Sequence, residues 1–327
     1  MSFKNIFSHK PETSSPIIVA PNGAGGLGDQ MSAFLAACKI ARDNPGVEIH
    51  YNVCDFLDPD KYFASDIWQN HRWQACPIPF DILDGLLRKP PKGGDHHKFF
   101  ELSNYDLRSL LKKFNIHFWA YFPTALYKYF AAAAAWVKYD SAGIAIPMMF
   151  GWNDKIPARG LIVLPMIDFA TVPCEFAAGF ELRAPLDDRN SKKLRAIAGT
   201  PNSICLHVRR GDYIRPPFNH RAVSANYIES AIREIMRREN WSNATVFIFC
   251  SDADWVKEKV MNIKIPGLKL DYVNINTEQF PSAELELMRN CNAYILSFGM
   301  FGEMAAFLNR GDTMIIKPDY DNPQHWE

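Results

Sequence analysis

The stretch SICLHVRRGDY, residues 203–213, decides the fold of this chain. Its first six residues form an apolar run that predicts a buried strand, and two arginines, a glycine and an aspartate follow directly. Apolar runs that alternate with helices are typical of a parallel sheet with helices on both faces. Ligands of such sheets bind beyond the carboxyl ends of the strands. We therefore expect Arg209 and Arg210 to leave the sheet at its ligand-binding edge.

The alternation continues from this stretch to the C-terminus. The sequence predicts further strands over 244–251, 268–274, 293–297 and 313–318, and helices over 186–198, 224–238, 253–260, 282–290 and 301–308. The helix over 224–238 is amphipathic, with Tyr227, Ile228, Ile232 and Ile235 on one side. Residues 176–327 are accordingly interpreted as one Rossmann-like α/β domain that binds the nucleotide part of a ligand.

The N-terminal half opens with the same kind of unit. A short apolar run at 15–20 is followed by the glycine-rich PNGAGGLGDQ, residues 21–30, and by a helical pattern from Met31 onward. Further strands are expected over 47–53 and 160–165, a loop over 77–97, and mainly helix over 99–150. We interpret residues 1–175 as a second α/β domain, so that two Rossmann-like halves face each other across a cleft.

Composition excludes several classes of protein. The chain has 327 residues, and its 36 basic and 36 acidic residues cancel, whereas a general nucleic-acid binder needs an excess of positive charge. The seven cysteines form no CxxC pair and no zinc spacing, which favours reduced, structural thiols. The sequence shows no stretch fit for a signal peptide or a membrane span. We expect a soluble, cytoplasmic protein, with the Golgi lumen as the alternative if an anchor has been removed.

The arginine loop is the strongest candidate for chemistry. Guanidinium groups at the end of a buried strand can grip a pyrophosphate through charge-assisted hydrogen bonds, which stabilises a departing nucleoside diphosphate. Gly211 permits a tight turn, and Asp212 can hold one guanidinium in place. The alternative interpretation is a salt-bridge cluster on the surface at the end of a strand.

Two glycine loops are weaker candidates. The first spans residues 23–30 and the second residues 297–303, each between a predicted strand and a predicted helix. Backbone N–H groups at such a helix start can hold a phosphate, but for either loop taken alone we favour a tight turn without any ligand. Asp252 and Asp254 form a DxD pair that could hold a metal ion, although we favour a helix cap or a nucleoside contact.

Taken together and in this order, the three loops resemble the α-1,2-fucosyltransferase family, glycosyltransferase family 11. HVRRGDY (207–213) is similar to that family's arginine motif, and GGLGDQM (25–31) to its N-terminal loop. The segment LMRNCNAYILSFGMFGEMAAFLNRGDT (287–313) is similar to the family's C-terminal block. The resemblance covers roughly the whole chain and is best from Phe180 onward.

This resemblance implies a GT-B-type α/β fold, GDP-fucose as donor, a glycan acceptor, inversion at the sugar carbon, and no requirement for a metal or cofactor. It implies that Arg209 binds the diphosphate and that Asp252 approaches the nucleoside. The donor-binding residues expected in all are Gly26, Gly28, Gln30, His207, Arg209, Arg210, Asp252, Ser297, Phe298, Gly299 and Phe301. Catalytic roles are expected for Arg209, Asp212 and Asp29, with Glu303 as a further candidate for the general base.

The chain also departs from the family's pattern. Asp29 stands where members carry Asn, Met300 stands where they carry Ser or Thr, and Glu303 and Met304 replace an apolar residue and a Trp. Two alternatives to fucose transfer therefore stay open. One is a transferase that uses another nucleotide-linked deoxysugar or forms another linkage, and the other is a non-catalytic protein that binds GDP or glycans.

Overall fold

The computed structural model describes residues 17–20, 26–53, 56, 76–77, 100–120, 161–163, 172–215, 222–276, 280–309 and 311–327. The chain divides into two compact units, Met1–Arg183 and Ala184–Glu327. The boundary that we expected between residues 175 and 176 lies shortly before this division. In the described part of the chain, no helix is both long enough and apolar enough to span a bilayer.

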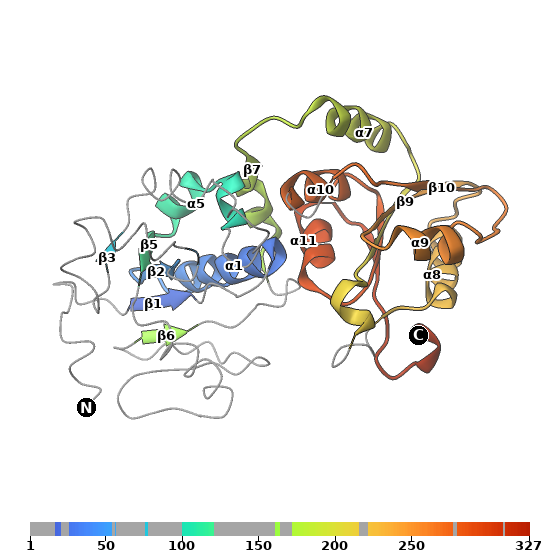
Figure 1. The fold of residues 1–327 in the computed structure, drawn as a ribbon. Coiled ribbons are helices and arrows are strands. Elements are labelled where there is room, and N and C mark those ends of the chain that lie inside the picture. Colours follow the sequence, from blue (N-terminus) through green and yellow to red (C-terminus); the bar gives the residue numbers. More distant parts are fainter. Residues whose placement is uncertain are drawn as a thin grey trace. The chain divides into compact units, whose positions relative to one another are not determined.

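The N-terminal unit is built on a sheet with the strand order β3-β5-β2-β1-β6 (Figure 1). Its strands pair in parallel except for β3, which is antiparallel to β5. The elements of this sheet are β1 (Ile17–Ala20), β2 (Glu48–Asn52), β3 (Cys76–Pro77), β5 (Ile116–Ala120) and β6 (Leu161–Val163). Around it lie α1 (Leu27–Asp43), η4 (Glu101–Asn104), α5 (Arg108–Lys113), η6 (Cys174–Gly179) and the pair β4 (Tyr105–Asp106) and β7 (Glu181–Leu182).

Helix α1 starts earlier than the apolar pattern indicated. It begins at Leu27, so Gly28, Asp29 and Gln30 form its first turn and are not part of a loop. The helix is buried along most of its length, and Phe34 packs against Tyr51 of β2 and against Phe180. Burial of such large aromatic side chains supplies much of the stability of this unit.

The expectation of a mainly helical segment over 99–150 holds only in part for the described residues 100–120, which include the helices η4 and α5. Residues 121–150 lie outside the described residues. Residues Ile116–Ala120 form the strand β5, which pairs in parallel with β2. Ile116 and Phe118 are buried, whereas His117 between them is exposed. That alternation has the period of a strand, which the aromatic content of the segment obscured.

The C-terminal unit follows the expected series closely. Its sheet is parallel throughout, with the strand order β10-β9-β8-β11-β12. The strands are β8 (Ser203–Val208), β9 (Ala244–Cys250), β10 (Leu268–Tyr272), β11 (Ala293–Leu296) and β12 (Met314–Ile316). The helices are α7 (Asp188–Ala198), η7 (Gly211–Ile214), α8 (Ala225–Arg238), α9 (Ala253–Trp255) with a π-helical continuation (Val256–Val260), α10 (Pro281–Met288), α11 (Met300–Leu308) and η10 (Pro323–His325). The expectation of Rossmann-like parallel-sheet units is confirmed.

Alternate residues of the central strand β8 face different helices. Ile204, Leu206 and Val208 belong to the core shared with α8 and the turn after α9. Cys205 and His207 point to the other face, where His207 contacts Phe301 of α11. Successive side chains of a strand point to opposite sides of the sheet. The helices that contact these two sets of side chains therefore cover both faces of the sheet, as we expected.

The described thiols are reduced. Cys38, Cys205, Cys250 and Cys291 are buried, and Cys174 is exposed. The side chains of Cys54 and Cys76 lie outside the described residues. Four of the five described cysteines thus behave as small core residues, which agrees with the expectation of structural thiols.

Candidate active site

The carboxyl ends of β8 and β11 are joined by two hydrogen bonds. The Ser297 N–H donates to the carbonyl oxygen of His207 at 2.9 Å, and the Arg209 N–H donates to Ser297 Oγ at 2.8 Å. Ser297 is 3% exposed. Buried hydrogen bonds of this kind fix backbone positions, so the two loops that follow these strands have a defined register against each other.

The side chain of Arg209 extends from this junction along the loop that follows β11. Its guanidinium carbon lies 4.6 Å from the centre of the Tyr213 ring, which is a cation–π contact. A Cβ atom on Gly299 would lie 3.5 Å from both Cδ and Nη1 of Arg209, so the side chain runs directly past this glycine. The residue itself is exposed. A contact with an aromatic ring orients a guanidinium, and guanidinium groups bind phosphates through paired hydrogen bonds.

Gly299 provides the N-cap of α11 in a conformation that suits only glycine. Its φ is 130° and its ψ is 151°. The helix that follows has nine residues, and its first N–H groups have no partners within the helix. Such a helix start carries partial positive charge, which favours a bound anion. The guanidinium of Arg209 lies at the same place, so two sources of positive potential coincide.

His207 is held neutral beneath these loops. Burial lowers its pKa from 6.5 to about 4, and the charge of Arg209 contributes to the same shift. Its ring lies 5.6 Å from the ring of Phe301, and its buried Nδ1 atom has no hydrogen-bond partner among the residues that the structure describes. A Cβ atom on Gly302 would lie only 2.8 Å from this Nδ1 atom. His207 therefore fills the space that Gly302 leaves open.

Phe298 begins a row of aromatic rings that leads away from Arg209. Its ring lies 6.2 Å from the ring of Tyr213 and 5.3 Å from that of Tyr320. The ring of Trp326 lies 5.3 Å beyond Tyr320, and Tyr320 is 51% exposed. The row follows the loops after β8, β11 and β12, all at the carboxyl edge of the sheet.

Arg210 has very different surroundings from Arg209. It is 7% exposed, and its Nε donates to Asp252 Oδ2 at 3.0 Å while its Nη1 donates to Glu327 Oε2 at 2.8 Å. Its guanidinium carbon lies 4.3 Å from the centre of the Trp255 ring. Asp252 also caps α9 by accepting the Trp255 N–H at 3.0 Å, so the expected role of Asp252 as a helix cap is confirmed.

Of the other expected site residues, Asp212 lies in the same loop as Arg209, and the rest lie at the start of α1 in the N-terminal unit. The backbone of Asp212 is in the 3₁₀ turn η7, and its side chain is outside what the structure describes. Gly26 is the N-cap of α1, and Gly28, Asp29 and Gln30 follow in the N-terminal unit. Gln30 is committed to the core, since its Oε1 accepts the Leu102 N–H at 3.0 Å and its backbone oxygen accepts the Tyr51 hydroxyl at 3.0 Å.

Sequence reasoning missed one titratable residue beside Asp29. Glu101 is 8% exposed and accepts a hydrogen bond from the Leu27 N–H at the start of α1. Burial raises its pKa from 4.5 to about 7; the Leu27 N–H opposes this shift and the charge of Asp29 adds to it. No local pattern marks Glu101, because it is the fold that brings residue 101 to the first turn of a helix that starts at residue 27.

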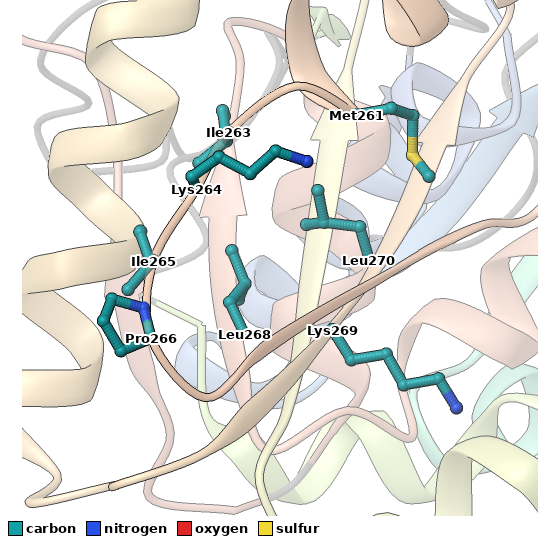
Figure 2. Close-up of a pocket in the computed structure, with 8 residues that line it drawn as sticks. All are labelled: Met261, Ile263, Lys264, Ile265, Pro266, Leu268, Lys269 and Leu270. Atoms are coloured by element: carbon teal, nitrogen blue, oxygen red, sulfur yellow. The ribbon is translucent and has the colours of Figure 1, made fainter.

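In the described ranges, no group of three His, Cys, Asp or Glu side chains could hold a metal ion. A hollow in the C-terminal unit lies apart from the loops after β8 and β11. It is lined by Met261, Ile263, Lys264, Ile265, Pro266, Leu268, Lys269 and Leu270, which belong to β10 and to the segment that enters it (Figure 2). Ligands of parallel sheets bind at the carboxyl ends of the strands, so this hollow is a poorer candidate than the Arg209 site.

The geometry thus joins His207, Arg209, Ser297, Phe298, Gly299 and Phe301 in one place, and sets Arg210 with Asp252 in another. Residues 179–326 match the model of glycosyl transferase family 11. This confirms, over the C-terminal unit, the resemblance that the three loops indicated. Every residue of the Arg209 site lies inside the part of the chain that matches this family.

Individual relatives agree with the family 11 match. A galactoside alpha-(1,2)-fucosyltransferase 2 from Rattus norvegicus is 30% identical over 127 residues, 38% of this chain and 34% of that protein. An alpha-1,2-colitosyltransferase from Escherichia coli is 25% identical over 139 residues, 41% of this chain and 46% of that protein. The matches therefore span about a third to a half of these relatives' length.

The crystal structure of NodZ alpha-1,6-fucosyltransferase soaked with GDP-fucose has a TM-score of 0.44 and 12% identity, covering 95% of this chain and 97% of that one.

Proposed function

We propose that this protein is an inverting, metal-independent glycosyltransferase that moves fucose from GDP-fucose to a hydroxyl group of a glycan acceptor, forming an α-1,2 linkage. One observation carries the proposal: the Arg209 guanidinium rests on Tyr213 beside Gly299 at the start of α11. A diphosphate placed there would meet a cation and a row of backbone N–H groups together. The matched family and the named relatives are glycosyltransferases, which supports this use of the site.

In the proposed reaction an oxygen of the acceptor attacks the anomeric carbon of fucose. A new carbon–oxygen bond forms as the bond from that carbon to the β-phosphate oxygen breaks, and GDP departs with the bonding electrons. The attack from the opposite side inverts the configuration of the carbon. Negative charge grows on the phosphate oxygens as the bond breaks, so Arg209 and the N–H groups of α11 stabilise the transition state more than the ground state.

The neutral state of His207 also suits this role. A histidine with a pKa of about 4 carries no charge near pH 7, so it neither competes with Arg209 for the phosphate nor changes its charge there. We assign it to packing beneath the loop. The positive charge that we assign to the diphosphate is then that of Arg209, supported by the helix start.

The proton of the attacking hydroxyl needs a base. Asp29, Asp212 and Glu303 are the carboxylates that we proposed from the sequence. Glu303 Oε2 lies 2.9 Å from Lys317 Nζ, so this carboxylate is already engaged in an ion pair. We therefore favour Asp29 or Asp212 as the general base. Asp29→Asn and Asp212→Asn should each be compared with the wild type, and the variant that lacks the base should lose turnover while its affinity for GDP stays unchanged.

The decisive experiment measures nucleotide binding and sugar transfer together. Calorimetry should show that GDP binds more tightly than UDP or dTDP, and labelled GDP-fucose offered to a glycan panel should give a fucosylated product. Arg209→Ala should lower kcat/KM by about 100-fold or more, because it removes charge stabilisation of the leaving group.

Arg233→Ala is the matched control for this substitution. Arg233 lies on α8, pairs with Glu229 and has a half-exposed side chain. Its loss should leave transfer unchanged, since exposed ion pairs contribute little to stability. Wild-type rates in the Arg209→Ala protein would contradict the diphosphate role. Loss of transfer after treatment with a chelator would contradict metal independence.

One of the relatives suggests a second candidate for the donor sugar. The relative from Escherichia coli is named as an alpha-1,2-colitosyltransferase, so a nucleotide-linked deoxysugar other than fucose is the next candidate. Competition between GDP-fucose and other GDP-linked deoxysugars, scored by kcat/KM, separates the two donors. GDP binding with neither transfer nor donor hydrolysis would instead support a non-catalytic protein, the other alternative that the sequence left open.

A further inference from the structure

Arg210 is the residue whose surroundings differ most from its expected role. We propose that Arg210 is a positioning residue that fixes Tyr213 beneath Arg209, and that it does so through Glu327 and Asp252 without contacting the donor. The inference rests on the proposed function, because it assumes that Arg209 binds the diphosphate. It adds a role for the C-terminal segment, which no sequence motif indicated.

The side chain of Arg210 is enclosed by a closed set of contacts. Asp252 and Glu327 each accept a hydrogen bond from the guanidinium, and the Trp255 ring lies under it. Glu327 Oε1 in turn accepts the Trp255 Nε1–H at 2.6 Å. Arg210 therefore contacts all three of the other side chains, and two carboxylates flank one buried cation. A guanidinium that is already held by two carboxylates and a ring is poorly available to a phosphate.

The backbone of Arg210 transmits this anchoring to the site. Its carbonyl oxygen accepts the N–H groups of Tyr213 at 2.6 Å and Ile214 at 3.1 Å, which closes the turn η7. Tyr213 is 5% exposed, and its ring supports the Arg209 guanidinium. Movement of Arg210 would therefore shift the ring on which Arg209 rests, and small displacements of a charged group cost much of its effect.

Glu327 is itself held in place by the chain around it. Its backbone N–H donates to the Ala222 oxygen at 3.0 Å, and Trp326 forms a β-bridge with Val223. The Ser224 N–H donates to the His325 oxygen at 2.9 Å, and Ser224 Oγ caps α8. The C-terminal segment is thus fastened to the start of α8 and presents Glu327 to the guanidinium from a fixed position.

Glu327→Gln tests the proposal because the two possible roles of Arg210 predict opposite signs. If Arg210 positions Tyr213, loss of one carboxylate loosens the turn, and GDP should bind roughly tenfold more weakly. If Arg210 binds phosphate directly, loss of a competing carboxylate releases the guanidinium, and GDP should bind as tightly as before or more tightly. Titration calorimetry with GDP measures this difference, and the second result would overturn the proposal.

A double-mutant cycle adds an independent readout. Arg210→Met and Glu327→Gln should each weaken GDP binding, and the double variant should be no weaker than Arg210→Met alone, since both act through one cluster. Additive losses would overturn the proposal. Arg210→Lys should restore only part of the affinity, because an ammonium group cannot make the two-sided contact and stack on Trp255 as a guanidinium does.

The same titrations separate displacement from unfolding. A partly unfolded preparation lowers the fraction of chains that bind GDP, whereas a displaced Arg209 lowers the affinity of all of them. Arg233→Met serves as the matched control and should bind GDP like the wild type. If Arg210→Met fails to fold, Glu327→Gln still decides the question. If the wild-type protein binds no GDP, the proposed function fails and this inference falls with it; tight wild-type binding with an unchanged Glu327→Gln variant refutes the inference alone.

Discussion

The Nδ1 atom of His207 lies 2.8 Å from the position that a Cβ atom on Gly302 would take. The same Cβ atom would lie 3.1 Å from Cδ2 of Leu296. Both neighbours are packed into strands, so neither can move far without disturbing the sheet. Glycine at 302 and histidine at 207 are therefore a matched pair, and α11 approaches β8 closely only because one residue has no side chain.

Gly302→Ala should destabilise the C-terminal unit by about 1–3 kcal/mol, because an added methyl group in a packed core forces its neighbours apart. Urea denaturation followed by circular dichroism measures the change in the free energy of unfolding. Gly211→Ala is the control, since a Cβ atom there meets no atom within 4 Å. Equal stability of the two variants would contradict the close packing of α11 on β8.

Gly299→Ala should act through the backbone and not through contacts. The φ of 130° is strained for any residue with a Cβ atom, and we expect a loss of at least about 1 kcal/mol in the free energy of unfolding. GDP affinity should fall as well, because the start of α11 would turn away from Arg209. For the free energy of unfolding alone, Gly26→Ala is the comparison, since Gly26 has a φ of −70° and open space around it. An unchanged affinity for GDP would separate α11 from the anion site.

Glu101 predicts a pH dependence of the N-terminal unit. Its pKa is raised from 4.5 to about 7, so between these values the folded protein holds a proton that the unfolded chain has released. Stability should therefore fall as the pH rises from 4.5 to 7, by up to about 3 kcal/mol for this one group. Glu101→Gln should remove that loss and raise the melting temperature at pH 8 but not at pH 4. Glu175→Gln, at an exposed position in the same unit, should have no such effect.

The lowered pKa of His207 predicts that the stability of the C-terminal unit falls as the pH becomes more acidic. Its pKa is lowered from 6.5 to about 4, so between these pH values the unfolded chain binds a proton that the folded protein does not bind. Stability contributed by the buried neutral imidazole is present above pH 6.5 and is lost as the pH falls toward 4. His207→Asn should flatten the acid limb of the stability curve for the C-terminal unit, whereas His117→Asn, exposed on β5, should leave it unchanged. Identical acid limbs for the wild type and His207→Asn would contradict the burial of this ring.

Much of the C-terminal unit could be predicted from sequence because its signals are local. Runs such as 203–208 and 244–250 are apolar throughout, as strands buried on both faces must be, and the helices between them carry clear periodicity. Ser224 and Asp252 also begin their helices as their residue types suggest. The strand β5 was missed because its short alternation lies in a segment rich in aromatic residues, where helix and strand patterns overlap.

The site could be predicted only in part, for a different reason. Arg209, Ser297 and Gly299 were found because each lies at the end of an identifiable strand. The ion pair of Arg210 with Glu327 joins residues far apart in the chain, and the hydrogen bond from Leu27 to Glu101 does the same in the other unit. Such contacts depend on the completed fold, and no window of sequence contains both partners.

Arg209 and Arg210 are neighbours in the chain, yet one is exposed and the other buried. An extended chain turns successive side chains to opposite sides, so their order, and not their shared chemistry, separates the two environments. Deletion of one residue after Val208 would move Arg210 to the exposed position and Gly211 to the position between the carboxylates, whereas insertion of one residue would move Arg209 between the carboxylates and place the new residue at the exposed position. The spacing of this short segment is consequently as restrictive as its composition, and length variation should be tolerated far less here than a conservative replacement.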